Sequence, residues 1–141
     1  MPTAHDVAAF ILQRTGEISA MKLQKLLYYS QAWHLVWAEN PLFDERIEAW
    51  ANGPVIRDVY DIHRGFFSVA DWHGDPDSLD ESEKESVIAV LDFYGDKTAQ
   101  WLSNLTHQEL PWMMARRGML PEERGDREIT TASMHEYYSS L

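Results

Sequence analysis

Cysteine is absent from the 141-residue sequence, and so is any long apolar run. Without cysteine the chain cannot form a disulfide framework, a thiolate nucleophile or a zinc–thiolate site. No apolar stretch is long enough to span a membrane as a helix, and the first residues lack the basic and then apolar layout of a secretory signal peptide. We therefore expect a cytoplasmic protein that forms a single domain over residues 1–141 and has no membrane partner.

Basic residues are also scarce: 12 lysines and arginines stand against 23 aspartates and glutamates, and the formal net charge is −11. Because such a surface repels phosphates, we expect no direct binding to nucleic acid. Residues 71–96 hold nine acidic residues and one lysine, which gives this segment a net charge of −8. The segment either keeps the protein soluble or steers a basic partner towards it. The basic cluster of the C-terminal third is diluted by acids and is interpreted as a solvated loop: Arg116, Arg117, Arg124 and Arg127.

The most strongly patterned stretch is residues 19–38. Apolar residues such as Leu23, Leu26 and Leu27 recur at spacings of three and four, which predicts a helix with an apolar stripe. Aromatic side chains also occupy the flanks of the stripe, and a helix that is apolar on most sides is buried on most sides. We therefore expect a central helix around which the other elements pack. Its polar exceptions form either a solvated edge or a polar surface offered to a partner: Lys22, Gln24, Lys25 and Gln31.

Capping residues and apolar patterns predict the remaining elements. Helices are expected over residues 4–15, 55–64 and 81–94, after Asp96, from a Thr106–Glu109 capping box to about Arg117, and after residue 131. Two short strands, residues 46–51 and 66–72, are expected to pair with each other. The predicted fold is mainly α: a single compact domain of six or seven helices around a central buried helix, with a small two-stranded β element.

Motifs that carry chemistry are few. His107 and Glu109 have the His-x-Glu spacing of zinc deaminases, but no cysteine pair follows, and helix capping explains them better. A second group could cluster in space, but its spacing does not favour a metal ion: Asp61, His63, Asp71 and His73. No phosphate-binding loop or nucleophile elbow is present. We therefore expect no catalytic residues, no metal and no cofactor. A small enzyme of unknown chemistry remains an alternative.

Several rare residue types recur in a fixed order, from the start of the central helix through Asn52-Gly53-Pro54 to Pro111-Trp112. This order resembles the Panacea domain of SocA-like and GepA-like antitoxins, over about residues 5 to 140. The residues that carry the resemblance are called the signature residues below. They are Lys22, Leu23, Leu26, Tyr28, Trp33, Trp50, Gly53, Pro54, Val55, Tyr60, His107 and Trp112.

The resemblance implies an antitoxin of a toxin–antitoxin system with a role in phage defence. Such proteins are encoded beside unrelated toxins and neutralise them by forming a complex, so the implied partner is a cognate toxin. The alternative that the family implies is a proteolytic adaptor, which delivers a toxin to a Clp-type protease and has this protease or a chaperone as a second partner.

Residues for toxin binding are proposed from charge and pattern. Asp80, Glu81, Glu83 and Glu85 lie in the acidic segment and would meet a basic toxin face. Trp72 and Tyr138 have polar neighbours and are interpreted as surface anchors. Lys25 and Glu48 have no packing role that the sequence explains. They either pair across the junction of helix and strand or contact the toxin.

Overall fold

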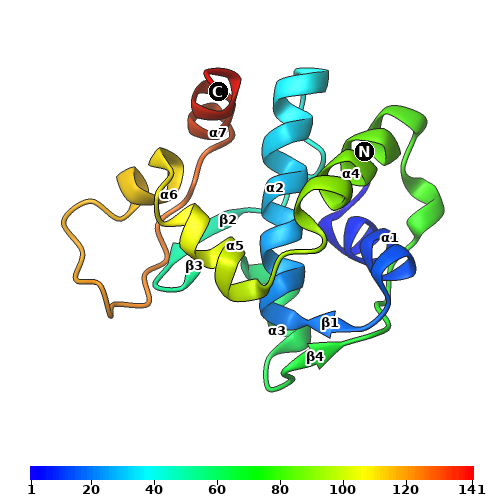
Figure 1. The fold of residues 1–141 in the computed structure, drawn as a ribbon, viewed down its shortest axis with the longest axis horizontal. Coiled ribbons are helices and arrows are strands. Elements are labelled where there is room, and N and C mark those ends of the chain that lie inside the picture. The colour runs from blue at the N-terminus through cyan, green and yellow to red at the C-terminus, as the bar shows by residue number, and fades with distance from the viewer.

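The computed structural model describes residues 1–141 and has α2 (Ala20–Ala38) at its centre. Figure 1 shows α1 (Ala4–Thr15) and α4 (Glu81–Tyr94) on one side of α2, and α5 (Ala99–Thr106), α6 (Leu110–Ala115) and α7 (Thr131–Ser139) on the other. Of the 19 residues of α2, 13 are buried, so the predicted central helix is confirmed. With seven α-helices and little strand, the mainly α fold class is confirmed as well. No helix combines the length and the apolar character needed to cross a membrane.

The strands form two small antiparallel sheets instead of one. β2 (Ile47–Trp50) pairs with β3 (Gly53–Ile56) in a tight hairpin, and β1 (Ile18–Ser19) pairs with β4 (Ser68–Val69). The predicted pairing of strands 46–51 and 66–72 is therefore wrong. A local hairpin closes a much shorter loop, and Gly53 supplies the positive φ of 123° that its turn requires. The third helix, α3 (Arg57–His63), consequently begins two residues later than predicted.

Two predicted helix starts are also wrong. Thr106 is the last residue of α5, and its hydroxyl donates to the carbonyl of Ser103 at 2.7 Å instead of capping a new helix. Glu109 precedes α6 but turns its carboxylate into the core. The fifth helix is capped by Thr98 and not by Asp96. Between β4 and α4 lies one 3₁₀ turn, η1 (Pro76–Ser78).

The polar residues of α2 are neither a solvated edge nor a partner surface, because most of them are buried. Gln24 accepts from the backbone N–H of Ile56 at 2.8 Å and donates to the carbonyl of the same residue at 3.2 Å. Gln31 accepts from the N–H of Leu42 at 2.7 Å and donates to the carbonyl of Phe43 at 2.8 Å. Each side-chain amide thus completes the hydrogen bonds of a neighbouring backbone segment that water does not reach.

We predict that Gln24→Leu lowers the free energy of unfolding by about 2–4 kcal/mol, because it leaves the buried N–H of Ile56 without a partner and removes one hydrogen bond to the carbonyl of the same residue. Urea unfolding followed by circular dichroism measures this loss. The control is Gln108→Leu at an exposed position, which we expect to shift the unfolding free energy by less than about 0.5 kcal/mol. Equal losses in the two variants would contradict the role of Gln24.

Candidate functional site

Several of the signature residues meet at the β2–β3 hairpin. Gly53 lies directly over the side chain of Lys25, and a Cβ atom at this position would lie 2.7 Å from the lysine Cε. The Lys25 amine donates to the carbonyl of Pro54 at 3.2 Å. A side chain at position 53 would displace Lys25. In addition, the backbone at this position has a positive φ that L-residues rarely adopt. The signature residues Gly53 and Pro54 are therefore parts of one buried contact with Lys25.

Side chains from the C-terminal half hold the other edge of the hairpin. Trp112 donates its indole N–H to the carbonyl of Trp50 at 2.8 Å, and Arg116 donates to the carbonyl of Ala49 at 2.8 Å. His107 stacks on Trp112, with ring centroids 4.0 Å apart. Burial lowers the pKa of His107, as do the charges of Lys25 and Arg116. These contacts fix the position of the hairpin against α6 (Leu110–Ala115).

Lys25 is buried without a carboxylate partner. Its side chain has no exposed surface, so it cannot contact a partner protein in this conformation. Burial lowers its pKa from 10.5 to about 7. The predicted ion pair with Glu48 does not form, because the carboxylate of Glu48 accepts from the indole N–H of Trp50 at 2.8 Å and faces Arg46 at 3.5 Å. The two residues that the sequence left unexplained have separate structural contacts.

A second polar contact joins α2 to the C-terminal helices. The hydroxyls of Tyr29 and Tyr138 each donate to Oε1 of Glu109 at 2.7 Å, and the hydroxyls of Tyr28 and Tyr138 lie 3.0 Å apart. Burial raises the pKa of Glu109, and the two tyrosine hydrogen bonds oppose this rise. Tyr138 is almost wholly buried, so its prediction as a surface anchor is wrong.

The tyrosines continue as an aromatic cluster towards the surface. Tyr94 of α4 stacks on Tyr29 with ring centroids 4.3 Å apart, and its hydroxyl accepts from the indole N–H of Trp33 at 3.0 Å. Trp33 in turn stacks on Trp37 at 5.5 Å. His34 lies 2.8 Å from the hydroxyl of Ser86 and adds a polar contact between α2 and α4.

Where this cluster reaches the surface, α2 and α4 form an apolar groove of about 250 Å³. Its lining is entirely hydrophobic: Trp33, Trp37, Ala89, Val90, Phe93 and Tyr94. Trp37 is 51 % exposed and Phe93 is 64 % exposed. The sequence analysis did not single out this groove. Exposed apolar surface rimmed by polar residues is typical of a site that binds another protein.

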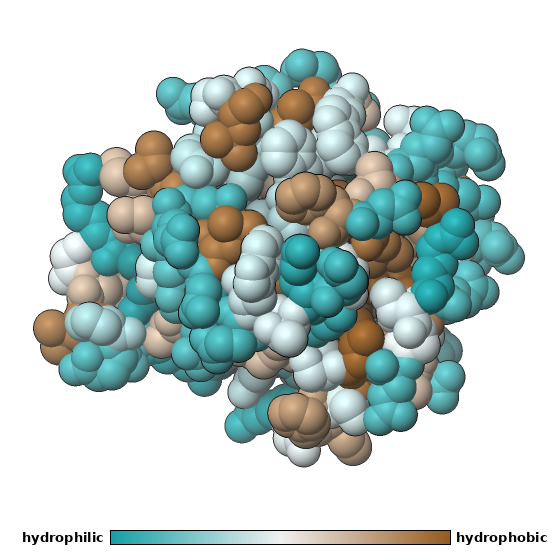
Figure 2. Space-filling model, in the orientation of Figure 1, coloured by the Kyte–Doolittle hydropathy of each residue, from teal (hydrophilic) through white to brown (hydrophobic).

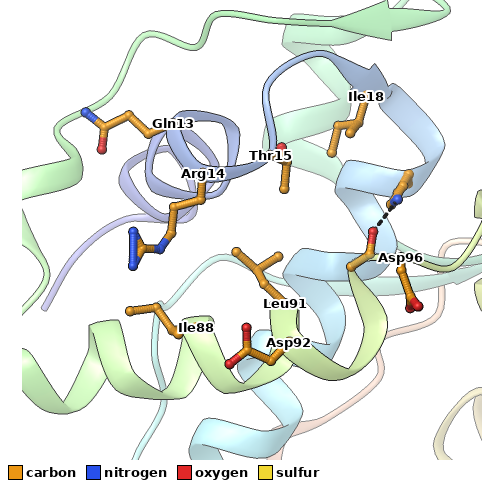
Figure 3. A pocket seen from close by; sticks show the side chains of 10 residues that line it. Gln13, Arg14, Thr15, Ile18, Ile88, Leu91, Asp92 and Asp96 are labelled. Carbon is orange, nitrogen blue, oxygen red and sulfur yellow. Dashed lines mark hydrogen bonds between the residues drawn. The ribbon is translucent and has the colours of Figure 1, made fainter.

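The largest hollow, of about 810 Å³, lies between α1 and α4 (Figure 3). Arg14 reaches into it from α1, and Asp92 and Asp96 line the opposite side. The amine of the signature residue Lys22 already donates to the carbonyl of Gly95 at 2.6 Å. Figure 2 shows apolar residues exposed among hydrophilic ones over this part of the molecule. Charges of both signs and an engaged lysine make this hollow a less specific candidate than the apolar groove.

A third hollow, of about 310 Å³, lies between α2, the hairpin and the loop after α6. The guanidinium of Arg124 lies 3.8 Å from the centroid of Trp50 and 5.4 Å from that of Tyr60. Arg116 is buried and donates to four backbone carbonyls, three of them in this loop, so its prediction as a solvated residue is wrong. The signature residues Trp50 and Tyr60 thus have a partner within the chain.

The residues proposed for toxin binding lie in three places. Asp80 and Glu83 form the capping box that begins α4, whereas Glu81 and Glu85 are exposed on its first turns. The half-buried Trp72 donates to His5 of α1 at 3.1 Å. Lys25 and Glu48 lie at the hairpin. In addition, no three histidine, aspartate or glutamate side chains are grouped so that they could hold a metal ion.

We predict that burial of Lys25 makes the stability depend on pH. Between about pH 7 and 10 the unfolded chain keeps the lysine proton and the folded protein does not, so the wild type is destabilised as the pH falls through this range. Relative to Lys25→Met, it should lose about 1.4 kcal/mol per pH unit and reach a constant difference below pH 7. Urea unfolding of both proteins at several pH values tests this, and a difference that does not vary with pH would contradict it.

We also predict that Glu109→Leu lowers the free energy of unfolding by about 2–4 kcal/mol, because buried tyrosine hydroxyls lose their acceptor. Glu109→Gln keeps an acceptor oxygen of similar position and should stay within about 1 kcal/mol of the wild type. The pair is compared by chemical denaturation. Similar losses in both variants would show that the hydrogen bonds of Glu109 do not stabilise the fold.

Comparison with known proteins supports the sequence resemblance. No curated protein and no solved structure matches this chain. Residues 23–113 match the family model described as antitoxin SocA-like, Panacea domain. The match covers more than half of the 141 residues and runs from α2 through the hairpin and α4 to α6. The chain therefore belongs to the family of SocA-like antitoxins with a Panacea domain.

Proposed function

We propose that this protein is an antitoxin that acts in the cytoplasm and neutralises a cognate protein toxin by binding it directly. The family match carries the proposal, since an antitoxin acts on a toxin. The apolar groove between α2 and α4 supports it, because the groove offers exposed tryptophan and phenylalanine side chains that a partner can bury.

We also propose that the protein acts without catalysis. Three interior groups with shifted pKa values have hydrogen bonds that account for them: Lys25 with a backbone carbonyl, His63 with the side chain of Gln24, and Glu109 with two tyrosines. Burial lowers the pKa of His63, which favours the neutral imidazole that this contact uses. His107 stacks on Trp112, and its Nε2 has no hydrogen-bond partner. These contacts hold the fold together and account for the groups without a reaction.

The alternative is a proteolytic adaptor that brings the toxin to a Clp-type protease or a chaperone. One observation favours a second contact surface of this kind. Phe66 and Phe67 lie side by side between α3 and β4, and both side chains are strongly exposed. The carbonyl of Phe67 accepts from the N–H of Ala20 at 2.8 Å, which places this pair at the start of α2, whereas the groove lies at its last turns. A toxin and a protease could therefore bind at the same time.

We predict that co-expression with the protein encoded by the adjacent gene restores growth and yields a complex that survives gel filtration. Direct neutralisation should persist in cells that lack Clp proteases, because a bound toxin needs no degradation. Growth that recovers only when the protease is present, with no inhibition by the purified protein, would replace this proposal with the adaptor. If growth does not recover and no complex forms, both the antitoxin and the adaptor proposals are contradicted.

A further inference from the structure

We propose that the groove between α2 and α4 is the docking site of the toxin, and that its occupant is an amphipathic toxin segment with apolar anchors next to basic side chains. The inference rests on the proposed function and adds to it a surface and a chemistry of recognition. It uses two features of α4 that lie next to each other, an apolar hollow and the exposed carboxylates of Glu81 and Glu85, of which Glu81 lies 4.0 Å from the amine of Lys84.

The apolar half of the site is held ready for binding. The indole of Trp33 is fixed by its hydrogen bond to Tyr94, and Tyr94 is held by its stacking on Tyr29. Tyr29 is anchored in turn by Glu109. A groove floor that is already ordered loses little conformational entropy on binding, which favours affinity. On its rim, Trp37 and Phe93 present aromatic surface that no part of the chain covers.

The acidic half follows from the helical repeat of α4. Glu81, Glu85, Ala89 and Phe93 are exposed and are spaced by four residues, so they occupy successive turns in a row that winds slowly around the helix. A segment that follows this row passes from Ala89 in the apolar groove to both carboxylates in about two turns. Lys84 is the single base of α4. Electrostatic complementarity therefore selects a toxin segment whose apolar residues are followed by lysine or arginine.

The acidic row does not include all the acids of the segment. Asp80 accepts from the backbone N–H of Glu83 at 2.9 Å, and Glu83 accepts from the N–H of Asp80 at 2.8 Å. These two carboxylates are therefore needed to begin α4, and reversing their charge would damage the helix itself. Only Glu81 and Glu85 can be changed to test recognition without this effect.

The first test blocks the groove. Ala89→Trp fills it from an exposed helix position, and Phe93→Glu places a charge on its rim. Each should weaken the complex with the purified toxin from the adjacent gene by about 10-fold or more. The control, Phe67→Glu, changes an even more exposed phenylalanine (87 %) in the segment between α3 and β4 and should leave the affinity for the purified toxin unchanged. Circular dichroism and thermal melting confirm that all variants are folded.

The second test addresses charge. Glu85→Lys should slow association with the toxin at low salt, and the effect should shrink at high salt, because screening weakens long-range attraction. Glu122→Lys makes the same change of charge at an exposed position of the loop after α6 and should alter association much less. Equal effects of the two variants would contradict recognition by the row of carboxylates.

The outcomes separate this inference from the proposed function. If the toxin binds the wild type, and Ala89→Trp and Phe93→Glu neutralise it as well as the wild type does, the groove is not the docking site. The proposal of an antitoxin would then still stand. Absence of any complex with the wild type would overturn both. A wild type that dimerises on its own, and becomes monomeric in Ala89→Trp, would show that a second copy occupies the groove and would overturn the inference.

Discussion

The structure depends on the buried polar side chains of α2. Burial removes water as a hydrogen-bond partner, and all of these side chains except Ser30 have a partner inside the protein. Gln24 and Lys25 find theirs on β3, Gln31 on the segment after α2, and Tyr29 on the residue before α6. Because each contact reaches a different element, α2 fixes the positions of the others as well as filling the core.

This constraint links the family signature to the proposed site. Lys22, Gly53, Pro54 and Trp112 all hold neighbouring elements against α2 or against the hairpin. None of them needs to touch a toxin to be required. The surface that we assign to the toxin lies away from the hairpin, at the groove. There the hydrogen bond between Trp33 and Tyr94 joins the groove to the buried core. A rigid frame with an exposed aromatic edge suits a protein that acts by binding.

The sequence predicts the central helix, because aromatic residues on every side of α2 leave it no face for water. It also predicts the start of α4 at residue 81, since Asp80 and Ser82 are both residue types that cap helices, and the structure has Asp80 as the cap. It misses the hairpin, because Gly53-Pro54 also suits the first turn of a helix. It misassigns Glu109, because a capping carboxylate and a buried acceptor look alike in sequence. The groove is missed for a different reason. The sequence places Phe93 on the solvent-facing side of α4, but that Trp37 lies next to it depends on how two distant segments pack together.

Photo-crosslinking can show whether the edge shared by α2 and α4 touches the toxin. A benzophenone amino acid is introduced at position 89 in the groove or, for comparison, at position 67 between α3 and β4. We expect position 89 to form a covalent adduct with the toxin in the purified complex and position 67 to form none. Crosslinking from position 67 without any from position 89 would place the toxin on another surface and rule out the groove as its docking site.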